Sequence, residues 1–198
     1  LKKTGDKNNI MREAMEIFFD RYFIKNMDAN PYLMCFTNGV IDFKSKTFRQ
    51  GYPQDYITKT TGIPYVPYNP EANKDIVEEL LTFMDQLFPQ KDLCRYMWDH
   101  LAATLIGIKK EHAFNIYRGS GSNGKSILTE LMSQALGEYK GTVPITLVTE
   151  KRNAIGGTSS EIIQLKGVRY AVMQEPSKDA IINEGIMKEL TGGDPIQA

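Results

Sequence analysis

Residues 113–136 read Ala-Phe-Asn-Ile-Tyr-Arg-Gly-Ser-Gly-Ser-Asn-Gly-Lys-Ser-Ile-Leu-Thr-Glu-Leu-Met-Ser-Gln-Ala-Leu. This stretch decides the fold class, because an octet of the form G-x-x-x-x-G-K-[ST] lies between a strand-like run and a helical run. The strand candidate covers 113–117, and residues 127–136 have apolar side chains at helical spacing. A strand, a glycine-rich loop and a helix in this order predict the core of an α/β P-loop protein.

The octet suits phosphate binding at each position, namely Gly119, Ser120, Gly121, Ser122, Asn123, Gly124, Lys125 and Ser126. The glycines let successive backbone N–H groups turn toward phosphate oxygens without Cβ collisions. A helix that begins at Lys125 adds the positive end of its dipole. Lys125 is expected to contact the β- and γ-phosphates, and the Ser126 hydroxyl to ligate Mg²⁺. The sequence thus predicts a site for ATP and Mg²⁺, with a Gly/Ser-rich surface loop as the competing interpretation.

The same glycines also spell the dinucleotide fingerprint G-x-G-x-x-G. That fold requires an acidic residue at the end of a second strand, about twenty positions further on. The nearest candidate, Glu138, follows a predicted helix instead of a strand. The dinucleotide fold also gives no reason for a lysine directly after the third glycine, so the pattern favours the P-loop.

A P-loop hydrolase needs a second strand that brings a carboxylate beside the metal. Residues 170–173 are apolar on both faces, as in a buried parallel strand, and Pro176 ends the pairing. Glu175 follows at the edge where open α/β sheets bind ligands, so it is predicted to activate the attacking water and to contact Mg²⁺. Because residue 174 is Gln, one carboxylate stands where a pair is usual. An exposed loop glutamate is the alternative.

Upstream of the octet, the pattern predicts an N-terminal α+β unit. We expect an amphipathic helix over 9–24, capped by Asn8 or Asn9, and then strands over 32–36, 40–43 and 47–49. The sequences 38–39 (Asn-Gly) and 44–46 (Lys-Ser-Lys) compete as the hairpin turn, and the pattern does not choose between them.

Four prolines in 51–70 favour extended backbone and exclude helix. The tyrosines among them are expected to pack, with a stacking platform for single-stranded bases as the less favoured alternative. Further helices are predicted over 75–88, with a capping box of Asp75 and Glu78, over 92–108 and over 181–190. His100 is expected to pack and His112 to lie in a loop, since neither has a second metal ligand at the required spacing.

Composition is that of an ordinary globular protein, with 41% apolar and 24% charged residues in 198. Because 24 Lys+Arg balance 24 Asp+Glu, any nucleic-acid contact must come from a local cluster of cations. The longest apolar run, 101–108, is too short for a membrane span, so no membrane partner is expected. Cys35 and Cys94 are predicted to be reduced core thiols of an intracellular protein in a reducing compartment. The chain opens on Leu1, from which we expect a piece of a longer protein.

Together these motifs resemble the superfamily 3 helicases, in the poxvirus-type primase-helicase branch of large DNA viruses, phages and plasmids. The resemblance rests on 38–42 (Asn-Gly-Val-Ile-Asp) and the Tyr-Pro segment after it, on the phosphate loop, on 165–169 leading into 174–176 (Gln-Glu-Pro), and on 188–194 (Lys-Glu-Leu-Thr-Gly-Gly-Asp). These stretches cover most of the chain. Three motifs in this order are more specific than the loop alone.

The resemblance implies an AAA+ type core that is incomplete at its C-terminus, because the family's asparagine sensor, arginine finger and DNA-contacting hairpin would follow Ala198. It implies ATP-driven unwinding of DNA during replication by a homo-oligomeric ring, expected to be a hexamer. The implied partners are single-stranded or forked DNA and a fused or separate primase. Lys151 and Arg152 are expected to be a plain exposed cation pair, with a place in a pore loop as the less favoured alternative. On this basis 1–69 form the N-terminal unit, 70–110 a helical collar and 111–198 the P-loop core.

Two other functions share the phosphate loop. A small-molecule or nucleotide kinase needs an acceptor pocket and usually a lid with several arginines. Residues 141–167, where such a lid would lie, contain a single arginine, Arg152. A non-catalytic assembly module would hold nucleotide only to stabilise an oligomer. Stimulation of ATPase activity by single-stranded DNA separates the helicase from both.

Overall fold

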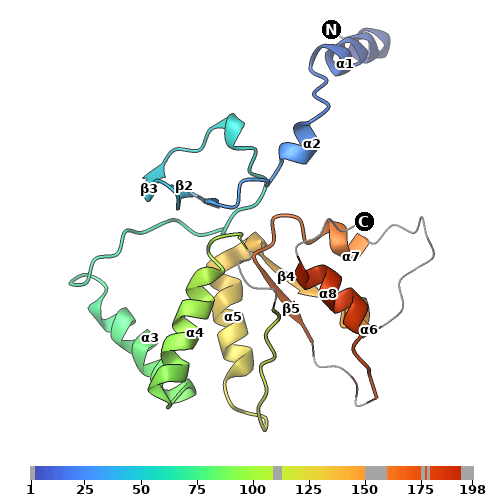
Figure 1. Ribbon diagram of the computed structural model, residues 1–198. Helices are drawn as coiled ribbons and strands as arrows, with labels where there is room; N and C mark the ends of the chain where they lie inside the picture. Colours follow the sequence, from blue (N-terminus) through green and yellow to red (C-terminus); the bar gives the residue numbers. More distant parts are fainter. Residues whose placement is uncertain (1–2, 109–112, 150–159, 175–176, 178, 193–198) are drawn as a thin grey trace.

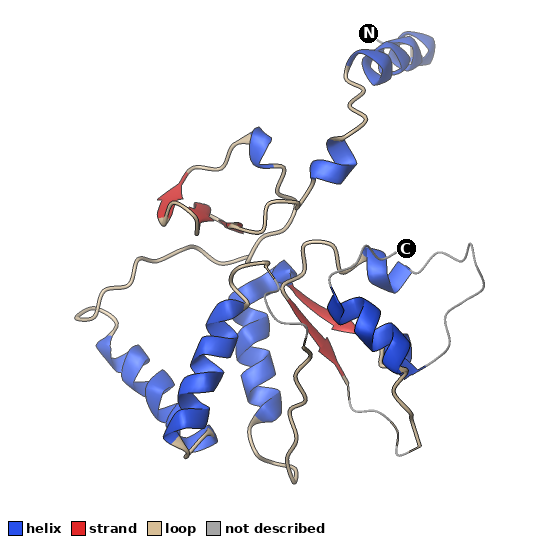
Figure 2. Cartoon of the chain, viewed as in Figure 1, coloured by secondary structure: helices blue, strands red, loops and turns tan. Residues whose placement is uncertain are grey.

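The computed structural model describes residues 3–108, 113–149, 160–174, 177 and 179–192, and they form a mixed α/β structure (Figures 1 and 2). The small N-terminal sheet lies at one end of the helices and parallel strands that carry the phosphate loop (Figure 1). No helix among the described residues combines the length and apolarity that a bilayer crossing requires.

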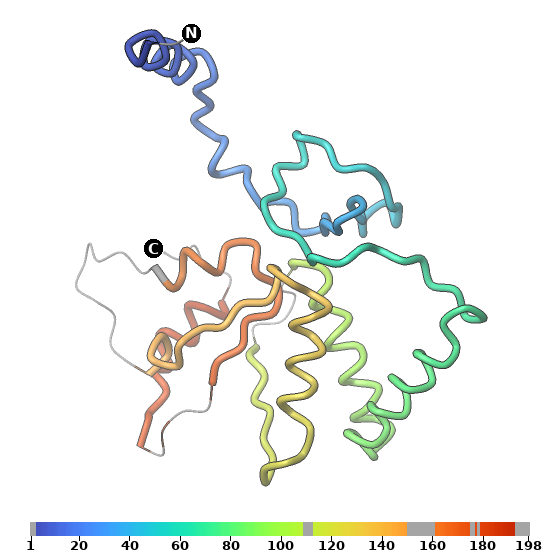
Figure 3. The backbone as a smooth tube through the Cα atoms, turned by 180° about the vertical axis from the view of Figure 1, so that it is seen from behind, coloured from blue at the N-terminus to red at the C-terminus, as the bar shows by residue number. Residues whose placement is uncertain are grey.

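The first helix, α1 (Thr4–Ile17), begins and ends earlier than the predicted 9–24 and projects away from the rest of the chain (Figure 3). The helix starts after Lys3, so neither predicted asparagine caps it. The prediction also fails beyond Ile17, where Asp20 Oδ1 accepts a hydrogen bond from the Tyr22 N–H at 2.8 Å. This local turn competes with the helix ladder, and only the single turn α2 (Phe23–Asn26) follows.

The N-terminal sheet is antiparallel in the order β1-β2-β3, formed by Leu33–Phe36, Gly39–Asp42 and Thr47–Arg49. Both candidate turns exist, because each joins a different pair of strands. In the second turn Asp42 Oδ1 accepts hydrogen bonds from the N–H groups of Lys44 (2.8 Å) and Ser45 (3.3 Å). The third predicted strand is confirmed, and the first two are right to within one residue at each end.

The segment 51–70 is extended except for one 3₁₀ turn, η1 (Pro53–Asp55), so the exclusion of all helix from it is wrong. Proline fits the first position of a helix because its fixed φ suits that position and its missing N–H is not needed there. Tyr65 packs on the sheet, with its ring centroid 4.8 Å from that of a β3 phenylalanine, as the packing interpretation predicts. Tyr68, in contrast, is 70% exposed.

Helices α3 (Lys74–Leu87), α4 (Lys91–Ala103) and α5 (Lys125–Leu136) contribute to one core. Its buried members are Met34, Met84, Cys94, Met97, Leu101, Leu128, Met132, Leu136, Tyr139 and Tyr170. Full burial of an apolar side chain of this size stabilises the fold by about 1.5–3 kcal/mol. This core therefore connects the collar helices, the helix after the phosphate loop and strand β1 of the N-terminal sheet.

Two predicted features of the collar helices are wrong. The capping box of Asp75 and Glu78 does not form, because α3 begins one residue earlier and has no side-chain cap. Helix α4 ends at Ala103 instead of continuing to 108. Beyond its end the Gly107 N–H donates to the Pro31 oxygen at 2.9 Å, which directs the chain to the N-terminal unit.

Strands β4 (Lys140–Val143) and β5 (Tyr170–Met173) form a parallel pair with Lys140 opposite Tyr170. The predicted bounds of β5 are confirmed, although Ala171 is exposed instead of buried. The predicted strand over 113–117 is wrong, because this segment is not paired with a strand of the described residues. The described part of the core sheet therefore has two strands, and α5 runs opposite to them (Figure 1).

The last described helix, α8 (Glu184–Gly192), begins three residues later than predicted. Asn183 causes the later start, because its Oδ1 accepts hydrogen bonds from the N–H groups of Gly185 (3.1 Å) and Ile186 (3.3 Å). Thr191 and Gly192, expected in a turn, belong to the helix. A second small core, formed by Val148, Ile186 and Met187, packs α8 against the single turn α6 (Thr146–Thr149). Two other short elements are the 3₁₀ turn η2 (Gly137–Tyr139), which follows α5, and the single helical turn α7 (Ser160–Ile163).

Candidate functional site

The phosphate loop is a sharply turned segment that ends at the first residue of α5. Gly121 (φ 93°), Ser122 (φ 44°) and Gly124 (φ 76°) all take left-handed backbone conformations. A Cβ on Gly124 would also lie 2.5 Å from Leu87 Cδ1 of α3. Position 124 therefore requires glycine both for its backbone angles and for the packing of the collar helix above it.

Lys125 curls back over this loop. Its Nζ donates to Asn123 Oδ1 at 2.7 Å and lies 3.0 Å from the place that a Cβ on Gly119 would occupy. A Cβ on Gly119 would also lie only 1.5 Å from Asn123 Nδ2. The loop is thus a narrow backbone cradle that holds an ammonium group.

The start of α5 supplies further hydrogen-bond donors. The first helical bond runs from the Leu128 N–H to the Gly124 oxygen at 2.9 Å. The N–H groups of Lys125, Ser126 and Ile127 therefore have no acceptor within the helix, and the helix dipole places positive charge beside them. These donors, the cradle and the ammonium group fit a phosphate group, and the exposed Ser126 hydroxyl is chemically suited to Mg²⁺.

The carboxyl ends of β4 and β5 and the amino end of α5 point the same way, because α5 runs opposite to the strands (Figure 1). Strand β5 leads to Gln174, which is exposed at this edge. Glu175 lies outside the described residues, as do Pro176, His112, Lys151, Arg152, Gly193 and Asp194. Ser126 is therefore the one predicted Mg²⁺ ligand whose position is described.

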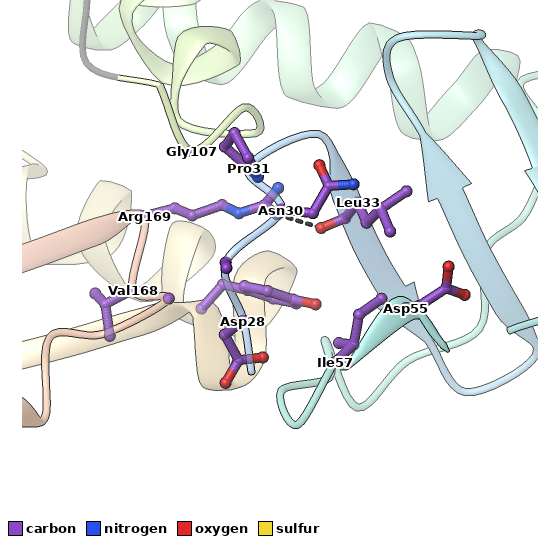
Figure 4. Close-up of a pocket in the computed structure, with 12 residues that line it drawn as sticks. Asp28, Asn30, Pro31, Leu33, Asp55, Ile57, Gly107, Val168 and Arg169 are labelled. Atoms are coloured by element: carbon purple, nitrogen blue, oxygen red, sulfur yellow. Dashed lines mark hydrogen bonds between the residues drawn. The ribbon is translucent and has the colours of Figure 1, made fainter. Parts of the chain in front are cut away.

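A polar junction that the sequence reasoning missed joins the N-terminal unit to the core (Figure 4). The Arg169 guanidinium donates hydrogen bonds to the carbonyl oxygens of Leu33 and Leu105, and it lies over the Tyr139 ring at 4.7 Å. Burial lowers the pKa of Arg169 from its ordinary value. The sequence does contain one signal for this junction, which is an arginine directly before an apolar strand.

The pocket beside Arg169 has a volume of about 130 Å³. Asp28, Asn30 and Asp55 also line it, so cation and carboxylates share one cavity (Figure 4). Asp28 already accepts hydrogen bonds from the N–H and hydroxyl of Thr58. These bonds hold the pocket wall in place and give it a structural role.

Tyr139 and Glu138 complete this junction. The Tyr139 hydroxyl accepts from the Cys35 N–H at 2.9 Å and donates to the Lys59 oxygen at 3.0 Å. The Glu138 carboxylate accepts from the Thr60 N–H at 2.7 Å. Glu138 lies in the 3₁₀ turn η2 and not at a strand end, which agrees with the rejection of the dinucleotide fingerprint.

Cys94 lies in the main core, as the sequence predicts, whereas Cys35 belongs to neither core cluster of the described residues, so the prediction of a core thiol is wrong for Cys35. Cys94 is buried and Cys35 is half-buried, and both are free thiols. Burial raises the pKa of each thiol. Within the described ranges, no group of three His, Cys, Asp or Glu side chains is arranged for a metal ion.

Several known proteins and one protein family are similar to this chain. Residues 1–89 match the family described as "D5 N terminal like". The chain is 36% identical over 198 residues to a "Putative helicase" of Acanthamoeba polyphaga mimivirus, and 33% identical over 198 residues to a "Putative helicase" of Invertebrate iridescent virus 6. It is 28% identical over 195 residues to a "Putative primase" of African swine fever virus. These matches support a relationship to the D5-like primase-helicases of large DNA viruses.

The three matches cover 100%, 98% and 97% of this D5-like chain, and 20% of each relative. The chain thus spans about one fifth of the length of these relatives. The resemblance inferred from the motifs is confirmed at the level of the family. The "D5 N terminal like" match ends at Pro89, between α3 and α4, so the phosphate loop lies outside it.

Proposed function

We propose that this D5-like chain carries the phosphate-binding part of an ATP-driven DNA helicase in a viral or mobile-element replication apparatus. One observation supports the proposal above all others: the G-x-x-x-x-G-K-S loop turns at the amino end of α5 with the Lys125 ammonium group folded over it. The names of the relatives, which include helicases and primases, agree with a role in replication.

Each residue has a proposed role in this site. The backbone N–H groups of 119–124 and of the first turn of α5 hold the phosphates, and Lys125 balances their negative charge. The Ser126 hydroxyl is the proposed protein ligand of Mg²⁺, which when bound neutralises charge on the phosphate oxygens. Glu175 is proposed to contact the metal and to orient and deprotonate the attacking water.

The assembly is also a proposal. Several copies form a ring, proposed to be a hexamer, in which each ATP is hydrolysed at a junction between subunits. A neighbouring subunit supplies the missing part of the site, and the ring moves along single-stranded or forked DNA with a primase attached or nearby. Because the net charge is zero, the cations that contact DNA must form a local cluster.

Steady-state ATPase assays with and without single-stranded DNA test this function. We expect DNA to stimulate the rate, Lys125→Ala to abolish Mg-ATP binding, and Glu175→Gln to keep binding while turnover stops. Equal ATPase rates in the wild type and in Glu175→Gln would instead favour a nucleotide-dependent assembly module. Transfer of phosphate to a small acceptor, without any effect of DNA, would favour a kinase.

A further inference from the structure

The segment that leads into the phosphate loop lacks the support that a strand usually has. Residues 113–119 are extended, but among the described residues their backbone makes no hydrogen bond to β5 or to any other element. The loop that follows contains one non-glycine residue in a left-handed conformation, Ser122, and such a conformation persists only where the surroundings hold it. Some other contact must therefore fix the position of Gly119.

Side chains supply that contact. The Tyr117 hydroxyl lies 2.7 Å from His100 Nε2 of α4, and the two rings pack edge to face at 6.0 Å. Two residues upstream, the Asn115 Oδ1 accepts from the Tyr96 hydroxyl at 3.4 Å. Alternate residues of an extended segment point to one side, and residues four apart share a helix face. The pairs 115/96 and 117/100 therefore form a matched seam between this segment and α4.

Tyr117 also reaches the core sheet. It packs against the main core, which includes Tyr170, the first residue of β5. Burial raises the pKa of Tyr117 far above its ordinary value. The hydroxyl thus stays protonated at physiological pH, where it contacts His100 of α4. Tyr117 comes two residues before Gly119 in the chain, and it is Gly119 that lies close to the Lys125 ammonium group.

We propose that Tyr117 is a positioning residue that holds the phosphate loop in its ligand-binding shape, anchored by His100 on α4 and by its packing against the main core. The inference rests on the proposed function, because it concerns the same nucleotide site. The other end of the loop is fixed by α5 and by Leu87 over Gly124. The collar helices α3 and α4 therefore hold the loop from both ends, and a movement of the collar changes nucleotide affinity.

Tyr117→Phe tests the proposal, because it keeps the ring and removes only the hydroxyl. Isothermal titration calorimetry is expected to give a dissociation constant for Mg-ATP about five-fold higher than in the wild type, which is the effect of one net hydrogen bond. Tyr139→Phe is the matched control. It also removes a buried hydroxyl with two partners, but at the junction with the N-terminal unit, so its Mg-ATP affinity is expected to stay within about 1.5-fold of the wild type.

A second measurement does not depend on nucleotide. In the nucleotide-free protein, hydrogen–deuterium exchange of 119–126 is expected to become faster in Tyr117→Phe and to stay unchanged in Tyr139→Phe. Equal exchange of this loop in all three proteins, or equal loss of affinity in both variants, would overturn the positioning role. If the wild type takes up no Mg-ATP, the proposed function fails, and the exchange measurement still decides the role of Tyr117.

Discussion

Replacement of Arg169 by methionine should destabilise the protein strongly, although this residue lies outside the nucleotide site. The guanidinium donates to two carbonyl oxygens and stacks on Tyr139. Hydrogen bonds from a charged donor contribute about 1.5–3 kcal/mol each, and a partly desolvated cation–π contact about 1 kcal/mol. Part of this sum is offset, because the substitution also removes the free-energy cost of burying the Arg169 charge. We expect a net loss of about 3 kcal/mol in the free energy of unfolding.

Thermal unfolding followed by circular dichroism measures this loss. For a chain of this size, 1 kcal/mol corresponds to about 2–4 °C, so the expected decrease in Tm is about 6–12 °C. Lys188→Met serves as the control, because Lys188 is exposed and pairs only weakly with Glu184 at 3.7 Å, and its Tm should change by less than about 2 °C. Equal Tm shifts in Arg169→Met and Lys188→Met would refute the stabilising role of the junction.

Three further predictions concern the loop, a surface ion pair and the core. Gly124→Ala should weaken Mg-ATP binding about ten-fold or more in calorimetry, because the new Cβ collides with Leu87 and the left-handed backbone at this position disfavours alanine. An unchanged affinity would contradict this geometry. The Arg49 guanidinium donates a hydrogen bond to the Asp55 carboxylate and thereby lowers the pKa of Asp55. This pair therefore stabilises the fold above about pH 4, and the stabilisation is lost as pH falls through the lowered pKa. In urea titrations the stability difference between wild type and Asp55→Asn should therefore shrink from about pH 6 to about pH 3, and a constant difference would exclude this linkage. Met84→Ala should cost about 2–5 kcal/mol by the same assay, since this side chain is 1% exposed, and a loss below about 1 kcal/mol would mean that the core closes around the deletion.

Features with a strong local cause were predictable from the sequence. The start of α5 at Lys125 follows from the glycine before it, and the bounds of β5 follow from an apolar run with an arginine before it. Strand β3 is confirmed for a similar local reason. The family was also predictable, because three separate motifs in one order carried it.

Features that depend on distant partners were not predictable. Residues 113–117 have the composition of a strand, but a strand also needs a neighbour, and here side chains of α4 hold the segment instead. The predicted helix over 9–24 is wrong because a local turn at Asp20 competes with it. The side-chain hydrogen bonds of Arg169 join residues more than sixty positions apart, and no local pattern contains that information.

Binding of Mg-ATP to the wild type and to Lys125→Ala, measured side by side by isothermal titration calorimetry, tests the phosphate site most directly. The geometry of the loop predicts saturable uptake by the wild type and none by the variant, with both proteins unfolding at similar temperatures. No uptake by the wild type, or the same affinity in Lys125→Ala, would contradict a nucleotide site at the amino end of α5.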